Sequence, residues 1–110
     1  MIRKGFLQAV ALASMLLSAA AWSAPGDAAW DAYVARFIEE SFAANPTFAV
    51  YAGRHEYDGR LPDFSAAALQ KEDARLLAAR QAILAVDPAG LDAERQRERE
   101  YLLAVVDKTL

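Results

Sequence analysis

Apolar residues at helical spacing, interrupted by proline and glycine, decide which fold this sequence can adopt. After residue 24, no segment sustains the alternation of apolar and polar residues that a half-buried strand needs. Apolar side chains instead recur every three or four residues, which places them along one side of a helix. In the first long run these residues are Trp30, Val34, Phe37, Ile38 and Phe42. The sequence therefore predicts an all-α fold of about three amphipathic helices.

Capping residues and prolines predict the helix ends in the first half of this region. Asp27 is a good cap for the first helix, and Asn45-Pro46 should end it because a residue before proline is pushed out of the helical region. Proline suits a first helical turn, so a brief second helix is expected from Pro46 to Ala52. Phe48 and Tyr51 are its candidate inward-facing side chains.

Residues 53–64 contain two glycines and a proline, which predicts an ordered loop between the first and second long helices. Its expected anchors are Tyr57, Leu61 and Phe64. Ser65 should cap the next long helix, which is expected to run for about 20 residues until Asp87-Pro88 breaks it. The predicted face of this helix contains Leu69, Leu76, Arg80, Ile83 and Leu84.

The last helix is expected to begin near Asp92 with a charged segment, residues 94–100. Opposite charges three residues apart, Glu94 with Arg97 and Arg97 with Glu100, predict ion pairs along a solvated face, although the segment could also dock a partner. Apolar residues return at Tyr101, Leu102, Val105 and Val106. The apolar stripe is still in progress at Leu110, so residues 24–110 are expected to be the N-terminal part of a larger helical domain.

Residues 1–23 carry the order of features that marks a secretory signal peptide. Arg3 and Lys4 precede an apolar stretch from Phe6 to Ala21, and small residues follow around Ser23. A cut after Ser23 is expected, since a cut after Ala24 would leave proline next to the scissile bond. The mature protein is therefore predicted to be periplasmic or secreted.

An uncleaved membrane anchor is the alternative interpretation of this stretch, and it needs about 20 strongly apolar residues. The segment is shorter, rich in alanine and interrupted by Gln8, Ser14 and Ser18. It therefore favours cleavage, with no stable membrane anchor afterwards. The chain has no cysteine, so neither a lipidated thiol nor a disulfide can hold the mature protein.

The charge of the mature region argues against a nucleic-acid partner. Without Arg3 and Lys4 the chain keeps 10 basic and 15 acidic residues, a formal charge of −5. No basic cluster follows the signal peptide, and phosphate binding requires such a cluster.

His55 is the one histidine of the chain and the first residue to consider for metal or acid–base chemistry. A helical zinc site needs a second histidine four positions later, beyond a glutamate. His55-Glu56 begins in this way, but the fifth position is Gly59. The alternative is a partly exposed loop histidine bonded to the backbone, which the glycines favour.

Other polar residues also fail to form a catalytic pattern. Glu39 and Glu40 are adjacent, so on a helix they point about 100 degrees apart and cannot act as paired carboxylates. Ser41, Thr47 and Ser65 lack a nucleophile motif. No catalytic, cofactor-binding or metal-binding residue is assigned. Four aromatic residues could line a ligand groove, although core packing is the more typical use of such spacing: Phe48, Tyr51, Tyr57 and Phe64.

The order of short motifs resembles the N-terminal portion of a bacterial family, the domain of unknown function 885 family. The resemblance spans nearly all of the chain after the signal peptide. Its segments are Trp30-Asp31-Ala32-Tyr33, Phe37-Ile38-Glu39-Glu40, Asn45-Pro46-Thr47-Phe48-Ala49, Tyr51-Ala52-Gly53, residues 57–65 and residues 89–103.

The resemblance implies an exported, largely helical protein whose full-length form would be a zinc-dependent peptidase or hydrolase. The family's histidine–glutamate zinc-binding helix lies far downstream and matches no position here. Zinc is thus expected only for the full-length relative, and the expected partner is the rest of the longer chain. The alternative is a complete small periplasmic helical protein that binds a partner or ligand without catalysis, since three amphipathic helices can close on themselves.

Overall fold

The computed structural model describes residues 23–110, and this region is helical with no strand. The expected signal peptide lies outside the described residues except for Ser23. Three long helices, α1 (Asp27–Ala44), α3 (Ala66–Ala85) and α4 (Ala93–Thr109), are joined by a short α2 (Pro46–Tyr51) and two 3-10 turns, η1 (His55–Tyr57) and η2 (Pro88–Gly90). The all-α prediction is confirmed.

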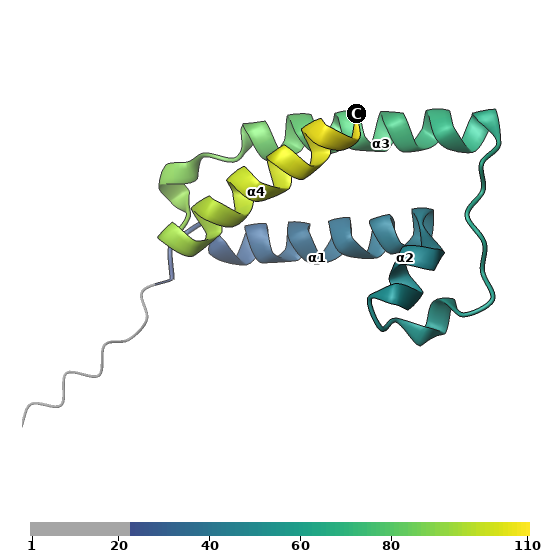
Figure 1. Ribbon diagram of the computed structural model, residues 1–110. Helices are drawn as coiled ribbons and strands as arrows, with labels where there is room; N and C mark the ends of the chain where they lie inside the picture. Colours follow the sequence, from purple (N-terminus) through teal and green to yellow (C-terminus); the bar gives the residue numbers. More distant parts are fainter. Residues whose placement is uncertain (1–22) are drawn as a thin grey trace, which may run out of the picture.

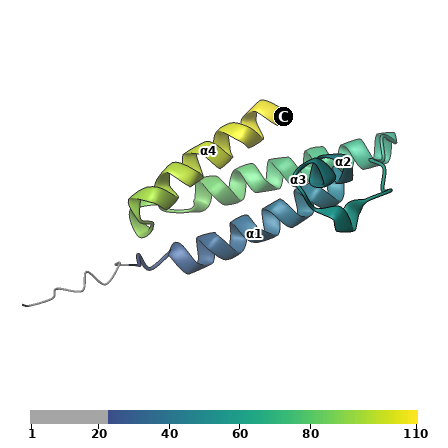
Figure 2. The ribbon, with the colours of Figure 1, turned by 60° about the horizontal axis from the view of Figure 1, so that its bottom comes forward.

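Each of the three long helices runs in the opposite direction to the one before it (Figure 1). From the end of α1 the chain passes through α2 and η1, and a loop then carries it to the start of α3. Helix α3 runs back beside α1, and η2 reverses the chain into α4. Helix α4 overlaps α3 in Figure 1, and Figure 2 shows the two helices starting close together at η2 and diverging toward the C-terminus.

The predicted breaks coincide with the ends of the helices. Asn45 ends α1 and caps α2, where its side chain accepts a hydrogen bond from the Phe48 amide at 3.2 Å. Ser65 caps α3 through the Ala68 amide at 3.2 Å, and Asp92 caps α4 through the Arg95 amide at 2.8 Å. These side chains satisfy backbone N–H groups that have no partner within the helix.

The prediction for Asp27 was wrong. Gly26, rather than Asp27, occupies the capping position of α1, and Asp27 is the first helical residue. The Asp27 side chain is 1% exposed and bonds outside its own helix, to the amides of Ala24 and Asp92. The Asp27 carboxylate, which the local sequence assigns to the helix cap, therefore makes a tertiary contact with the start of α4 instead.

One apolar core joins the three long helices and the connection between α3 and α4. Helix α1 supplies Trp30 and Phe37 from the predicted stripe, and α3 supplies Leu76 and Ile83 from its predicted face. The core also contains Ala79, Leu91 and Val106. Burial of these side chains removes apolar surface from water, which is the main favourable contribution to folding.

Four aromatic or aliphatic residues expected to face inward are exposed. The exposed fractions are 55% for Phe48, 92% for Tyr51, 86% for Leu61 and 77% for Phe64. The short α2 turns its proline and Ala49 inward instead. Within residues 23–110, no neighbouring element covers Leu61 or Phe64 of the loop before α3. Tyr57, the third expected anchor, is buried at 8% exposed.

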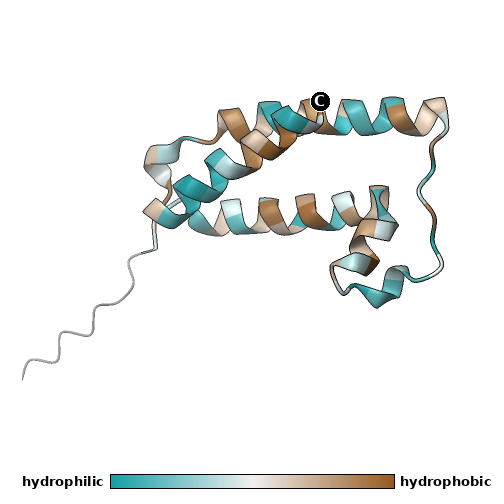
Figure 3. Cartoon of the chain, in the orientation of Figure 1, coloured by the Kyte–Doolittle hydropathy of each residue, from teal (hydrophilic) through white to brown (hydrophobic). Residues whose placement is uncertain are grey.

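The charged first half of α4 makes tertiary contacts instead of the predicted pairs along the helix. Arg95 binds Asp31 of α1, and Arg99 donates to the carbonyl of Ile83 in α3. In residues 23–110 no ion pair joins Glu94 to Arg97 or Arg97 to Glu100. Figure 3 shows the hydrophilic beginning of α4 giving way to hydrophobic residues later in the helix.

Candidate functional site

His55 lies in η1 and does not contribute to a metal-binding arrangement. Its side chain is 77% exposed, and Nδ1 lies 3.5 Å from Oδ1 of Asp58. The neighbouring Glu56 is paired with Arg54. Within residues 23–110 no three histidine, cysteine or acidic side chains lie together as potential ligands for a metal ion. The donor groups in this part of the chain therefore do not fit a zinc ion.

Glu39 and Glu40 face different partners, as their adjacent positions predict. Both Glu39 oxygens accept hydrogen bonds from Arg54, at 2.6 and 3.0 Å, and these bonds hold the pKa of Glu39 below its ordinary value. Glu40 lies on another side of α1, 3.8 Å from Nε of Arg36 and 3.9 Å from Nη1 of Arg75. The two carboxylates cannot act on one substrate atom.

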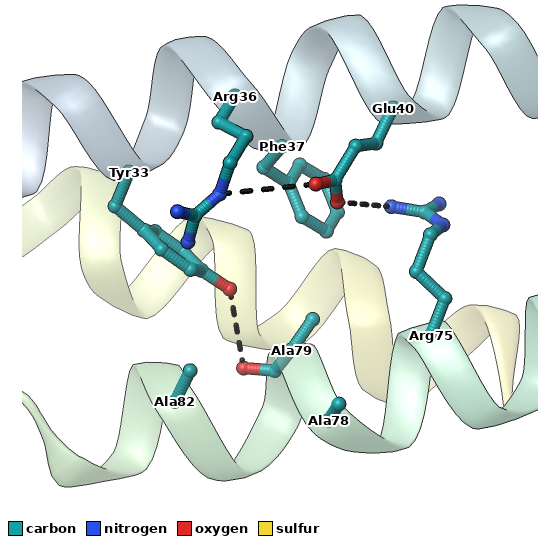
Figure 4. Close-up of a pocket in the computed structure, with 8 residues that line it drawn as sticks. All are labelled: Tyr33, Arg36, Phe37, Glu40, Arg75, Ala78, Ala79 and Ala82. Atoms are coloured by element: carbon teal, nitrogen blue, oxygen red, sulfur yellow. Dashed lines mark hydrogen bonds and ion pairs between the residues drawn. The ribbon is translucent and has the colours of Figure 1, made fainter.

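A shallow slot of about 340 Å³ lies between α1 and α3 (Figure 4). Helix α1 lines it with two aromatic and two charged residues, and α3 adds Arg75 and three alanines. The lining residues are Tyr33, Arg36, Phe37, Glu40, Arg75, Ala78, Ala79 and Ala82.

Arg75 is the central charge of this slot and is largely occupied by contacts within the protein. Nε and Nη2 each donate to Glu72 at 2.7 Å, and the guanidinium carbon lies 5.2 Å from the centre of the Phe37 ring. The bonds to Glu72 raise the pKa of Arg75 above its ordinary value, while burial acts in the opposite direction. Nη1 is buried and has no hydrogen-bond partner among the described residues. Its ion-pair partner is Glu40, whose Oε2 lies 3.9 Å away.

Tyr33 provides the remaining polar group of the slot. Its hydroxyl donates to the Ala79 carbonyl at 3.4 Å, and burial raises its pKa above the ordinary tyrosine value. The hydroxyl is therefore neutral near pH 7. The Tyr33 hydrogen bond and the contact of Arg75 with Phe37 join α1 to α3 across the slot.

A larger groove of about 1030 Å³ lies at the other end of the α1–α3 pair. The end of α1, the loop before α3 and the first turns of α3 line it, and Thr109 of α4 reaches its edge. Leu61, Phe64 and Leu69 give it an apolar surface, and Asp63, Lys71 and Glu72 are its charged members along with Glu40 and Arg75. Such a surface suits packing against another apolar element.

A polar cluster joins the beginning of the described chain to the start of α4, and sequence reasoning missed it. Asp27 accepts hydrogen bonds from the amides of Ala24 at 2.7 Å and Asp92 at 3.0 Å. Arg95 binds both oxygens of Asp31 at 2.7 Å and Asp92 at 2.6 Å. Because Asp27 and Asp92 are 65 residues apart, no local pattern could reveal their contact.

The comparisons with known proteins give no relative for this chain. No protein family, curated protein or solved structure matches it. Separately, none of the helices described here combines the length and apolar character needed to cross a membrane.

Proposed function

We propose that this chain is exported and forms the helical N-terminal part of a larger protein of the domain of unknown function 885 family. The proposed full-length protein is a zinc-dependent peptidase or hydrolase. In that protein, residues 24–110 would supply a surface for packing rather than catalytic residues. The motif order from Trp30 to Leu103 supports the family assignment, and the segment from Arg3 to Ser23 supports export.

The exposed apolar surface is the observation that carries the proposed packing role. Leu61 and Phe64 are 86% and 77% exposed although they flank a groove, and Leu69 is 51% exposed. Clustered exposed apolar groups mark surfaces that pack against another element. The proposed partner is the rest of the same longer chain.

The zinc chemistry would belong to that remaining chain. His55 is the one imidazole in the sequence, and its Nδ1 lies 3.5 Å from Oδ1 of Asp58. A catalytic zinc ion needs three protein ligands and an open position for water. No step of hydrolysis is therefore attributed to residues 24–110.

Purification of the native product from the extracytoplasmic fraction tests this proposal. The expected product begins at Ala24, contains zinc and hydrolyses peptides in a reaction that a chelator stops. Substitution of His55 by Ala is the matched control and should leave both zinc content and hydrolysis unchanged. A product retained in the cytoplasm with residues 1–23 attached would contradict export, and a zinc-free, inactive product would contradict the enzymatic assignment.

The closed core favours a second candidate, a complete small periplasmic binding protein. Trp30, Ile83 and Val106 come from three different helices and are each at most 2% exposed. The groove of about 1030 Å³ would then be its binding surface. Substitution of Phe64 by Ser should abolish ligand capture in this case, and would have no such effect if the groove is already filled by the rest of a longer chain.

A further inference from the structure

The start of the described chain is held in place by a buried carboxylate. The Ala24 amide donates to Oδ2 of Asp27 at 2.7 Å, and the Asp27 amide donates back to the Ala24 carbonyl at 3.1 Å. Next to them, the Gly26 amide donates to the Gly90 carbonyl at 2.8 Å. These contacts fix the Ala24 nitrogen against the turn between α3 and α4.

Negative charge exceeds positive charge around this nitrogen. Asp27, Asp31 and Asp92 all face Arg95, which is the cation that contacts them among the described residues. Arg95 forms hydrogen bonds with Asp31 and Asp92, but its Nη1 stays 3.7 Å from Asp27. A buried carboxylate is costly unless a positive group or hydrogen-bond donors compensate it. Asp27, at 1% exposed, is the least solvated of the three.

We propose that Asp27 is the binding site for the mature amino terminus of this protein. Hydrolysis of the bond between Ser23 and Ala24 transfers a water hydroxyl to the Ser23 carbonyl carbon and releases the Ala24 nitrogen as an amine. An α-amino group has a pKa of about 7.7 to 8.0, so this amine is mostly protonated at neutral pH. The hydrogen bond to Asp27 then becomes an ion pair. This inference rests on the export processing proposed above.

The surroundings of Ala24 suit such a group. Ser23 is exposed and Ala24 is half-buried, so removal of the preceding residues opens the nitrogen to water on one side while Asp27 binds it on the other. The alternative cut after Ala24 would delete the bonded nitrogen and leave Pro25 at the terminus. Of these two cuts, only the one after Ser23 leaves the bonded nitrogen as the amino terminus.

The consequence is a mature fold that is more stable than an otherwise identical chain with a neutral terminus. The ammonium group would tie the beginning of α1 to Asp27, whose other oxygen holds the Asp92 amide at the start of α4. Removal of the signal peptide would then strengthen the contact between α1 and α4.

Acetylation of the Ala24 amine in the native mature product measures how much the positive charge of this amine contributes to stability. An acetylated nitrogen keeps one N–H donor for Asp27 but carries no charge. We expect the folding equilibrium constant, measured by urea unfolding, to fall about tenfold on acetylation. The singly acetylated fraction is isolated, and peptide mapping confirms that the acetyl group is on Ala24 and that Lys71 and Lys108 are free.

Two variants test the assignment to Asp27. Asp27→Asn should abolish the effect of acetylation, whereas Asp31→Asn, the matched control in the same cluster, should retain it. If Asp27→Asn does not fold, the comparison on the unmutated product is sufficient. An Ala24 terminus with an unchanged unfolding midpoint after acetylation would overturn the ion pair alone, and a terminus at another residue would overturn the cut after Ser23 together with it.

Discussion

Trp30 illustrates, at the residue scale, which contacts a sequence can predict. Its place on the apolar stripe of α1 predicts burial, and its side chain is 2% exposed. Its indole Nε1 also donates to Oε2 of Glu98 at 3.0 Å, across 68 residues of sequence. Helical periodicity carries no information about that partner, because the register between α1 and α4 is set by packing.

Substitution of Trp30 by Phe tests the importance of this partly buried hydrogen bond. The ring of phenylalanine is smaller and has no donor, so we expect the free energy of unfolding to fall by about 2 kcal/mol. Urea unfolding measures the change. Glu98→Gln keeps an acceptor oxygen and serves as the control, with a smaller loss. Wild-type stability in Trp30→Phe would contradict the described packing.

Asp31 makes stability depend on pH through Arg95. The hydrogen bonds from Arg95 hold the pKa of Asp31 below its ordinary value, so the folded state favours the ionised form. Such a group stabilises the fold above its unfolded pKa, and the contribution is lost as pH falls through the lower, folded pKa. The urea midpoint of Asp31→Asn should therefore change less than that of wild type between about pH 5 and about pH 2. Equal acid sensitivity of both proteins would contradict this assignment.

At the scale of helices and turns, local chemistry predicted the ends of elements better than their orientation. Asn45, Ser65 and Asp92 act through backbone groups three residues away, so their roles can be read locally. The exposure of Tyr51 and Phe64 depends on which neighbouring elements lie above them. An apolar residue in a short helix or loop does not indicate which elements will cover it.

Gly26 provides a test of the contact between the start of α1 and the turn after α3. A Cβ atom at Gly26 would lie 2.7 Å from the Gly90 carbonyl oxygen, whereas a Cβ at Gly90 would meet nothing within 4 Å. We expect Gly26→Ala to lower the free energy of unfolding by about 1 to 3 kcal/mol. Gly90→Ala, the matched control, should change it by less than about 0.5 kcal/mol. Equal effects in thermal unfolding of the two variants would contradict the close approach.

At the scale of the whole molecule, the sequence predicted the fold class and the main core residues. The two hollows and the Asp27 cluster were not predictable, because each combines residues from elements far apart in the chain. Trp30, Phe37, Leu76 and Ile83 were predicted by periodicity and do form the core. Other members of the same predicted faces are exposed: Ile38 at 41%, Leu69 at 51% and Leu84 at 46%. The shape of the groove depends instead on the distance between the end of α1 and the start of α3, near the C-terminal end of α4.

The exposed groove predicts that residues 24–110 self-associate when produced alone. Leu61→Ser and Phe64→Ser together should reduce association in sedimentation experiments, while the free energy of unfolding changes by less than about 0.5 kcal/mol. Leu84→Ser, which alters an exposed leucine (46%) away from the groove, is the control and should leave association unchanged. Loss of helicity in the double variant would show that these side chains are packed in the isolated segment.

The intact mass of the native product tests the central claim that this helical unit belongs to a larger exported protein. The account predicts a product that begins at Ala24 and is much heavier than residues 24–110. These 87 residues alone would give about 9 to 10 kDa at about 110 Da each. A native product of that smaller mass would contradict the claim and favour the small binding protein instead.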